Sequence, residues 1–254
     1  PQGRRARGVE STGRGPVIGA VLPKGKARNI HWNATLREAA VRPAMTEGSL
    51  ALKIRPENVR ETLREKRRAN LVVFVVDASG SMGAKRRMEQ TKGAVLSLLL
   101  DSYHKRDQVA MISFRGQGAS VLLPPTRGMA RAKRCLSELP VGGRTPLVAG
   151  LRKALDLVRP LTLSKDSPFL PLVVLITDGR GNVSAGPGDA QTQIAAVGAE
   201  FRRRNVRAVV IDTEEGFVRL GMAQEAGLAL GAKTLSMGSL QAGTLAQTVK
   251  GFMR

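Results

Sequence analysis

From residue 70 onward the chain alternates between short, almost wholly apolar runs and longer amphipathic stretches. An unbroken apolar run of this length predicts a strand buried on both faces, as in a parallel sheet covered by helices. Such strands are expected at residues 71–76, 108–114, 170–176 and 206–211, with shorter ones at 120–124 and 234–235. Between them, apolar residues recur at helical spacing, which predicts helices at 87–104, 129–139, 147–158, 189–204, 217–230 and 240–253.

This order of elements predicts the fold class. Alternating strands and helices joined by short turns are typical of an α/β fold with a doubly wound, mostly parallel central sheet and helices on both faces. Residues 120–124 follow the turn-forming sequence Gly116-Gln117-Gly118, which favours a hairpin. We therefore expect one antiparallel edge strand in an otherwise parallel sheet.

Residues 1–69 follow a different pattern, and we expect them to form a basic arm in front of a domain at 70–254. The Gly/Arg-rich residues 1–15 contain too little apolar surface to order themselves and read as the end of a linker. The arm shows no core of its own, so we expect it to pack on the domain or on a partner, with Trp32 against the domain. Its expected elements are a strand at 16–23, a weak helix at 35–40, a strand at 50–54 and a charged helix at 57–69.

Charge narrows the choice of partners. The chain has 254 residues and a net charge of +21, and residues 1–69 alone hold 16 Lys/Arg against 6 Asp/Glu. Such a balance favours acidic protein segments or nucleic acid. Aromatic residues make up only 3% of the chain, which argues against a base-stacking surface. Acidic protein segments are therefore the expected partners, with nucleic acid as the weaker alternative.

The cysteine content, the length of the apolar runs and the first residues bear on where in the cell the protein is found. The single Cys135 rules out an intrachain disulfide and favours a reducing compartment, such as the cytoplasm or, in a plant, the plastid stroma. No apolar run approaches the roughly 20 residues of a membrane-spanning helix. The sequence starts at Pro1 without a Met or a signal-like segment, so we expect a fragment of a longer protein.

Oxygen-bearing side chains follow several of the expected strands and loops. Asp77, Ser79 and Ser81 come directly after the first apolar run, Thr145 lies in a Gly-rich loop, and Asp178 follows the run 170–176. Ligands of open α/β sheets bind at the carboxyl ends of the strands, so these groups should gather at one edge. Two carboxylates and three hydroxyls suit Mg2+ or another divalent cation. Taken alone, the first three residues could instead cap a helix.

The pattern Asp77-x-Ser79-x-Ser81, then Thr145, then Thr177-Asp178-Gly179, resembles the metal-ion-dependent adhesion site of the von Willebrand factor A (integrin I) fold. The resemblance implies that Ser79, Ser81 and Thr145 ligate the metal through their hydroxyls. It also implies that Asp77 and Asp178 contact the metal directly or through water. One coordination position would then remain for an Asp or Glu of a partner protein.

A second resemblance rests on longer stretches of the sequence. They are 75–82, 93–96, 107–110, 114–116, 122–127 and 177–182, with 20–25 and 64–67 in the arm. These stretches resemble the C-terminal domain of the D-subunit family of magnesium chelatases, to which cobalt chelatase subunits are related. The resemblance implies a domain that scaffolds an AAA+ chelatase I-type subunit and a large porphyrin-binding subunit for ATP-dependent insertion of Mg or Co into a tetrapyrrole.

The chain departs from that family in two ways. It contains no Gly-x-x-x-x-Gly-Lys-Ser/Thr loop and hence no expected nucleotide site, and Arg144 stands directly before Thr145. We therefore expect the chain itself to be non-catalytic, with no catalytic residues of its own. The alternative is a stand-alone protein-binding or assembly module of the same fold, unrelated to chelation.

Overall fold

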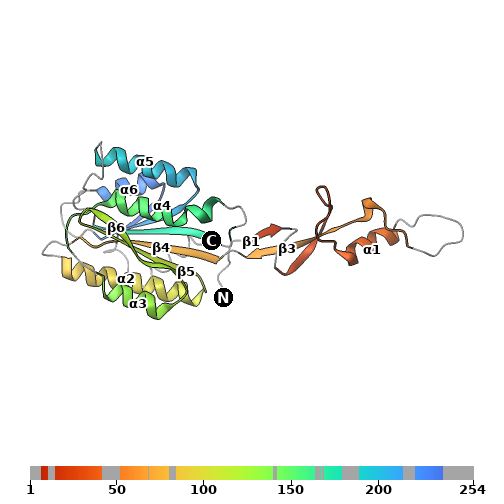
Figure 1. Ribbon diagram of the computed structural model, residues 1–254, viewed down its shortest axis with the longest axis horizontal. Coiled ribbons are helices and arrows are strands. Elements are labelled where there is room, and N and C mark those ends of the chain that lie inside the picture. The colour runs from red at the N-terminus through yellow and green to blue at the C-terminus, as the bar shows by residue number, and fades with distance from the viewer. Residues whose placement is uncertain are drawn as a thin grey trace. The chain divides into compact units, whose positions relative to one another are not determined.

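The computed structural model describes residues 7–10, 15–41, 52–67, 69–79, 84–139, 142–163, 167, 169–178, 189–213 and 221–236 (Figure 1). The chain divides into two compact units. The smaller unit runs from Arg4 to Arg68, and the larger unit holds Ala69–Arg254. Each unit has its own sheet, and each is described separately below.

The larger unit is built on a six-stranded sheet with the order β6-β5-β4-β7-β8-β9. All neighbouring pairs are parallel except β5 and β6, which are antiparallel, so the predicted α/β fold with one antiparallel edge is confirmed. The strands are β4 (Ala69–Asp77), β5 (Gln108–Arg115), β6 (Gly118–Thr126), β7 (Phe169–Thr177), β8 (Arg207–Asp212) and β9 (Lys233–Ser236).

Helices cover both faces of this sheet, as the ribbon diagram shows (Figure 1). One face packs against α2 (Ala84–His104) and α3 (Met129–Ser137). The other face packs against α4 (Leu147–Leu163), α5 (Ala190–Arg203) and α6 (Met222–Leu230). The helices at 87–104, 129–139, 147–158 and 189–204 are thus confirmed, with small shifts at their ends. Residues 217–220 and 240–253 lie outside the described residues.

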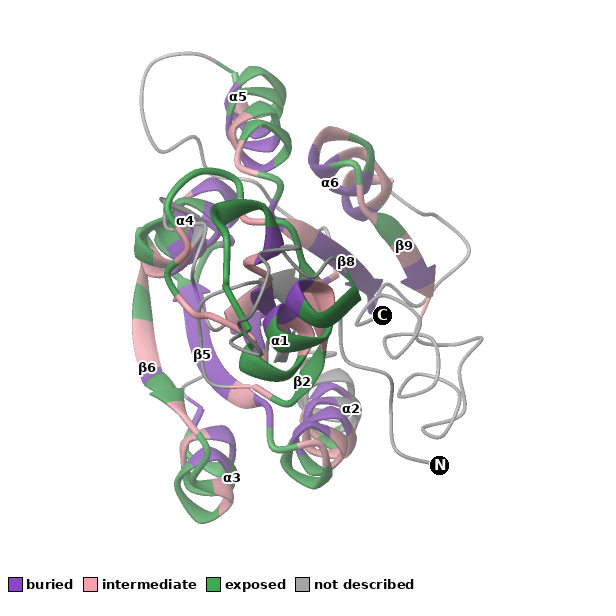
Figure 2. Cartoon of the chain, turned by 90° about the vertical axis from the view of Figure 1, so that its right-hand side faces the viewer, coloured by how far each residue is buried: buried purple, intermediate pink, exposed green. Residues whose placement is uncertain are grey.

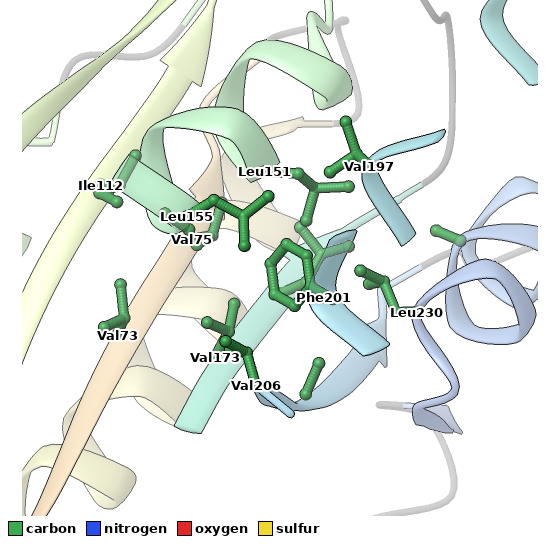
Figure 3. Close-up of a cluster of buried hydrophobic side chains, with 14 of the residues drawn as sticks. Val73, Val75, Ile112, Leu151, Leu155, Val173, Val197, Phe201, Val206 and Leu230 are labelled. Carbon is green, nitrogen blue, oxygen red and sulfur yellow. The ribbon is translucent and has the colours of Figure 1, made fainter. Parts of the chain in front are cut away.

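The central strand β4 explains why its sequence is apolar without a break. Successive side chains of a strand point to opposite faces. Val72, Phe74 and Val76 join the core under α2 and α3, whereas Leu71, Val73 and Val75 join the core under α4, α5 and α6. Figure 3 shows Val73 and Val75 in the second core. Burying each such side chain stabilises the folded state by roughly 1.5–3 kcal/mol, so β4 stabilises the packing of helices on both faces of the sheet.

The start of α5 matches the sequence prediction closely. Asp189 is its N-cap residue, and the Asp189 carboxylate accepts a hydrogen bond from the backbone N–H of Thr192 over 3.2 Å. Hydrogen bonding from Thr192 lowers the pKa of Asp189, because the bond favours the ionised carboxylate. The cap satisfies one of the backbone donors that every helix leaves free at its first turn.

The smaller unit contains a three-stranded antiparallel sheet with the order β1-β3-β2, formed by Arg7–Glu10, Glu61–Arg67 and Val17–Val21. It also contains α1 (Trp32–Val41) and a short 3-10 helix at Pro56–Asn58. The strand expected at 16–23 and the helix expected at 35–40 are confirmed. Residues Arg4–Arg68 form a compact unit of their own.

The charged helix predicted at 57–69 is wrong. Residues Glu61–Arg67 form β3, the central strand of the small sheet, and pair with strands on both sides. The four-residue spacing of Glu61 and Glu65 looked helical, but both side chains are buried in the unit. Glu61 accepts a hydrogen bond from the backbone N–H of Arg28 over 3.2 Å. Pairing across two ladders therefore overrides the local helix preference.

Two further expectations for residues 1–69 need correction. Arg7–Glu10, expected to belong to the end of a linker, pair with β3 as strand β1. Residues 52–54 have no regular secondary structure, so the strand predicted at 50–54 is absent from its described part. The contact expected between Trp32 and the following domain stays a prediction, because the two units are described separately. Among the described residues, no helix is both long and apolar enough to cross a bilayer.

Candidate metal centre

The carboxyl ends of three adjacent strands carry polar residues. Asp77 is the last residue of β4, Thr177 the last of β7 and Asp212 the last of β8. Thr177 and Asp212 are direct neighbours in the β7–β8 ladder, and Val76 pairs with Ile176 one step before the strands end. The parallel register therefore brings these residues to one edge of the sheet, where ligands of α/β proteins bind.

The Asp77 carboxylate is the best-defined group at this edge. It is only 9% exposed. Its Oδ1 accepts a hydrogen bond from the Ser79 backbone N–H over 2.9 Å, and its Oδ2 accepts one from Thr177 Oγ1 over 2.8 Å. One oxygen is thus held by the backbone of Ser79, which follows β4, and the other by Thr177, which ends the neighbouring strand β7. These two bonds fix the orientation of the carboxylate.

The electrostatic environment of Asp77 is unusual. The pKa of its carboxyl is raised from 3.8 to about 6, mainly because burial removes hydration from the ionised form. The charge of Asp178 contributes to this rise, and hydrogen bonds from Ser79 and Thr177 oppose it. The carboxylate is therefore costly to ionise as it stands. A bound cation would offset both the burial and the repulsion from Asp178.

The Gly-rich loop brings Thr145 to the same edge. The Gly142 N–H donates to the Ala78 carbonyl over 2.8 Å, directly after β4, and the Gly116 N–H donates to the Arg144 carbonyl over 2.8 Å. Thr145 is only 4% exposed. The loop is therefore tied between the end of β4 and the β5–β6 turn, and it holds Thr145 in place beside the residues that follow Asp77.

The loop needs glycine at its first two positions. Gly142 has φ +126° and Gly143 has φ +98°, a backbone region that other residues rarely adopt. A Cβ on Gly143 would also lie 3.1 Å from the Gly116 backbone nitrogen. The glycines that the sequence pattern singled out are therefore required by the path of the backbone.

The structure places four of the five predicted residues at this edge of the sheet. The backbone N–H of Ser79 is hydrogen-bonded to Asp77, Asp178 acts on Asp77 through its charge, and Thr145 lies in the loop that is bonded to Ala78. Ser81, together with Gly80 and Gly179, lies outside the described residues.

Two polar residues at this edge were not predicted from the sequence. Thr177 holds Asp77 Oδ2, although it was considered only as the residue before Asp178. Asp212 is 1% exposed, and its Oδ2 accepts a hydrogen bond from Gln224 Nε2 over 3.1 Å. Asp212 could have been predicted from the sequence, because it follows an apolar run just as Asp77 and Asp178 do.

The donor chemistry of the edge fits a hard divalent cation. Within the described parts of the chain, no three His, Cys, Asp or Glu side chains gather closely enough to hold a metal ion. A cation here would therefore rely on hydroxyl oxygens besides the carboxylates of Asp77 and Asp178. Mg2+ accepts such ligands, since it takes few carboxylates and keeps water in its coordination shell.

Comparison with protein families shows a domain match. Residues 72–180 match the model of the von Willebrand factor type A domain. The matched stretch begins in β4 and runs to just beyond Asp178, so it includes Asp77, Ser79, Ser81, Thr145 and Asp178.

Two curated relatives extend the similarity over almost the whole chain. The chain is 41% identical to the uncharacterised protein Rv2850c of Mycobacterium tuberculosis over 98% of its length. It is 36% identical to the magnesium-chelatase 67 kDa subunit of Heliobacterium mobile over 97% of its length. The chain spans only 38% and 39% of these two relatives, respectively.

Solved structures agree on the fold. The von Willebrand factor type A protein of Catenulispora acidiphila superposes with a TM-score of 0.51 at 20% identity. The match covers 75% of this chain and 43% of that one. At this level of identity the likeness concerns the fold alone.

Proposed function

Because the chain belongs to the von Willebrand factor type A domains and is a homologue of D-type magnesium-chelatase subunits, we propose that it is a metal-dependent protein-interaction domain of a chelatase. It would scaffold an AAA+ I-type subunit and a large porphyrin-binding subunit while Mg, or Co, is inserted into a tetrapyrrole. The chelatase relatives are named as subunits, so the chelation activity would belong to a complex and not to this chain alone.

The burial and fixed orientation of the Asp77 carboxylate are the main support for this proposal. This carboxylate is 9% exposed, is held through both oxygens and is raised in pKa partly by the charge of Asp178. The same carboxylate is well suited to hold a cation, because its orientation is fixed before binding. Ser79, Ser81 and Thr145 would supply hydroxyl ligands, and Asp77 and Asp178 would act directly or through water.

A bound Mg2+ would supply a positive centre that accepts one further oxygen ligand from an Asp or Glu of a partner protein. The contribution of this chain is to hold the ligands at the sheet edge and to leave that position open. Arg144 is exposed and lies directly before Thr145, so it adds a fixed positive charge near an approaching acidic side chain. The partner is therefore expected to present a carboxylate on a protruding segment.

Partner capture tests this proposal. The full-length protein is immobilised, and the I-type and porphyrin-binding subunits of the same organism are added with Mg2+ or with EDTA. We expect at least one subunit to be retained with Mg2+, to be released by EDTA, and to be lost with Asp77→Ala. Equal retention in all three conditions would contradict a metal-dependent contact.

Reconstitution separates the chelatase role from the alternative of a stand-alone interaction module of the same fold. The full-length protein is added to the two other subunits with ATP, Mg2+ and porphyrin. Formation of metalloporphyrin that requires the protein supports the chelatase role. Metal-dependent binding of a partner without any effect on metalloporphyrin formation would favour the alternative.

A further inference from the structure

In the smaller unit, the usual burial of apolar side chains and exposure of polar ones is largely reversed. Among its described residues, the buried ones are Ala39 and five polar residues, Thr35, Asn58, Glu61, Thr62 and Glu65. Nine of its described large apolar side chains are exposed instead, whereas Ile30, Val59 and Leu63 are half-buried. The nine are Val17, Ile18, Val21, Leu22, Trp32, Leu36, Val41, Leu52 and Ile54. Exposed apolar side chains that gather in one place mark an interaction site.

Strand β2 concentrates this exposed apolar surface. Val17, Ile18, Val21 and Leu22 lie in β2 or directly after it, and they are 48%, 51%, 37% and 63% exposed. No charged residue interrupts the sequence between Pro16 and Pro23. The ends of β2 are exposed, whereas Gly19 and Ala20 between them are half-buried (Figure 2).

Strand β2 is also an edge of the small sheet. It pairs with β3 on one side, and no described strand pairs with its other side. The outer backbone groups of such an edge can pair with a strand from another chain. A register shift between Val17 and Gly19, with Pro16 and Pro23 at the ends, limits the part open to pairing to a few residues.

Basic residues follow this edge directly. Lys24, Lys26 and Arg28 are exposed, and none of these side chains forms an ion pair with a described residue. We propose that β2 docks an extended segment of a partner protein, with apolar side chains over Val21 and Leu22 and acidic side chains against the three cations. This docking edge belongs to the smaller unit and the candidate metal centre to the larger one, and the proposed docking requires no metal.

Three other occupants fit less well. A bilayer would cover the apolar side chains but leave the edge backbone groups without hydrogen bonds, which is costly in lipid. A nucleic acid would neutralise the cations but leave the aliphatic side chains exposed. A second copy would bring together two chains that each carry a net charge of +21. An acidic, apolar strand satisfies the backbone, the side chains and the charge together.

Two synthetic peptides test the proposal with the full chain. Both carry a Thr-Val repeat, and one ends in three Glu whereas the other ends in three Lys. Binding is measured by fluorescence anisotropy in EDTA, and hydrogen exchange reports on the amides of residues 17–22. We expect the Glu peptide to bind and to protect these amides, and the Lys peptide to do neither.

A matched pair of variants locates the contact. Leu22→Glu places a negative charge beside the docking edge at a side chain that is 63% exposed, so folding should not suffer. Leu228→Glu makes the same change at an 81% exposed side chain of α6. We expect Leu22→Glu to weaken the Glu peptide about tenfold or more, through lost apolar contact and charge repulsion, and Leu228→Glu to leave binding unchanged.

Several results would overturn the proposal. These are absence of protection at residues 17–22, equal binding of the Lys peptide, or equal effects of the two variants. Dimerisation of the free chain through β2 would assign the edge to a second copy instead. Displacement of the peptide by phosphatidylglycerol vesicles would assign it to a membrane. Because all measurements are made in EDTA, failure here is distinct from failure of the proposed metal-dependent function.

Discussion

Thr177 Oγ1 donates a hydrogen bond to Asp77 Oδ2 over 2.8 Å and so joins the ends of β7 and β4 across 100 positions of the sequence. The Thr177 side chain is buried, and Asp77 is only 9% exposed. The bond holds one oxygen of the carboxylate while the Ser79 N–H holds the other. Thr177 is therefore a positioning residue for the candidate metal centre.

Thr177→Val should destabilise the protein by about 1–3 kcal/mol, because the swap leaves a buried carboxylate oxygen without its donor. It should also raise the pKa of Asp77 further and weaken Mg2+ binding. Urea unfolding and a Mg2+ titration measure the two effects. Ser120→Ala, on the exposed side of edge strand β6, is the control and should change stability by less than about 0.5 kcal/mol. Equal effects of the two variants would remove Thr177 from the site.

The raised pKa of Asp77 predicts a pH dependence of stability in metal-free protein. Between pH 3.8 and about 6 the folded state keeps a proton on Asp77 that the unfolded state has lost. The contribution of this group is thus fully present below the unfolded pKa and is lost as pH rises through the folded pKa. The difference between these pKa values corresponds to on the order of 3 kcal/mol.

Asp77→Asn provides the measurement, since Asn does not titrate. In EDTA, the free energy of unfolding of the wild type relative to this variant should fall as pH rises from about 4 to 6.5. Mg2+ should reverse the trend, because a cation favours the ionised carboxylate. Parallel pH profiles of the two proteins in EDTA would contradict the assigned pKa.

Gly143→Ala should destabilise the Thr145 loop. Its φ of +98° strains any residue with a Cβ, and the new atom would lie 3.1 Å from the Gly116 nitrogen. We expect a loss of about 1–3 kcal/mol and weaker Mg2+ binding. Gly93→Ala in α2 is the matched control. Its Cβ meets nothing within 4 Å, and Ala favours a helix by roughly 0.5–1 kcal/mol. Thermal unfolding of both variants should therefore shift in opposite directions.

The larger unit could be predicted from sequence because its pattern and its burial agree. A strand such as β4 is apolar at each position from Leu71 to Val76, and only a central strand with helices on both faces buries such a run. The same logic placed Asp77 and Asp178 at one edge, since both follow strands of this kind. The hydrogen bond from Thr177 to Asp77 was not predicted, because a bond between strand ends depends on the register of the two strands.

The smaller unit could not be predicted in the same way. Its central strand β3 reads Glu-Thr-Leu-Arg-Glu-Lys-Arg, with one large apolar residue, so its hydrophobic pattern contains no strand signal. Glu61 and Glu65 are buried there, although charged residues are normally expected on the surface. Pairing with β1 and β2, which are distant in sequence, decides this element. Local propensity alone gave a helix.

Calorimetric titration of Mg2+ into the metal-free full chain tests the central claim most directly. Wild-type protein should show one saturable site at pH 7.5. Asp77→Ala should abolish it, with circular dichroism confirming that the fold is kept. Asp156→Asn, at an exposed position of α4, is the control and should bind as the wild type does. A wild type without saturable binding, or an Asp77→Ala variant that binds Mg2+ equally well, would contradict a metal centre at this edge of the sheet.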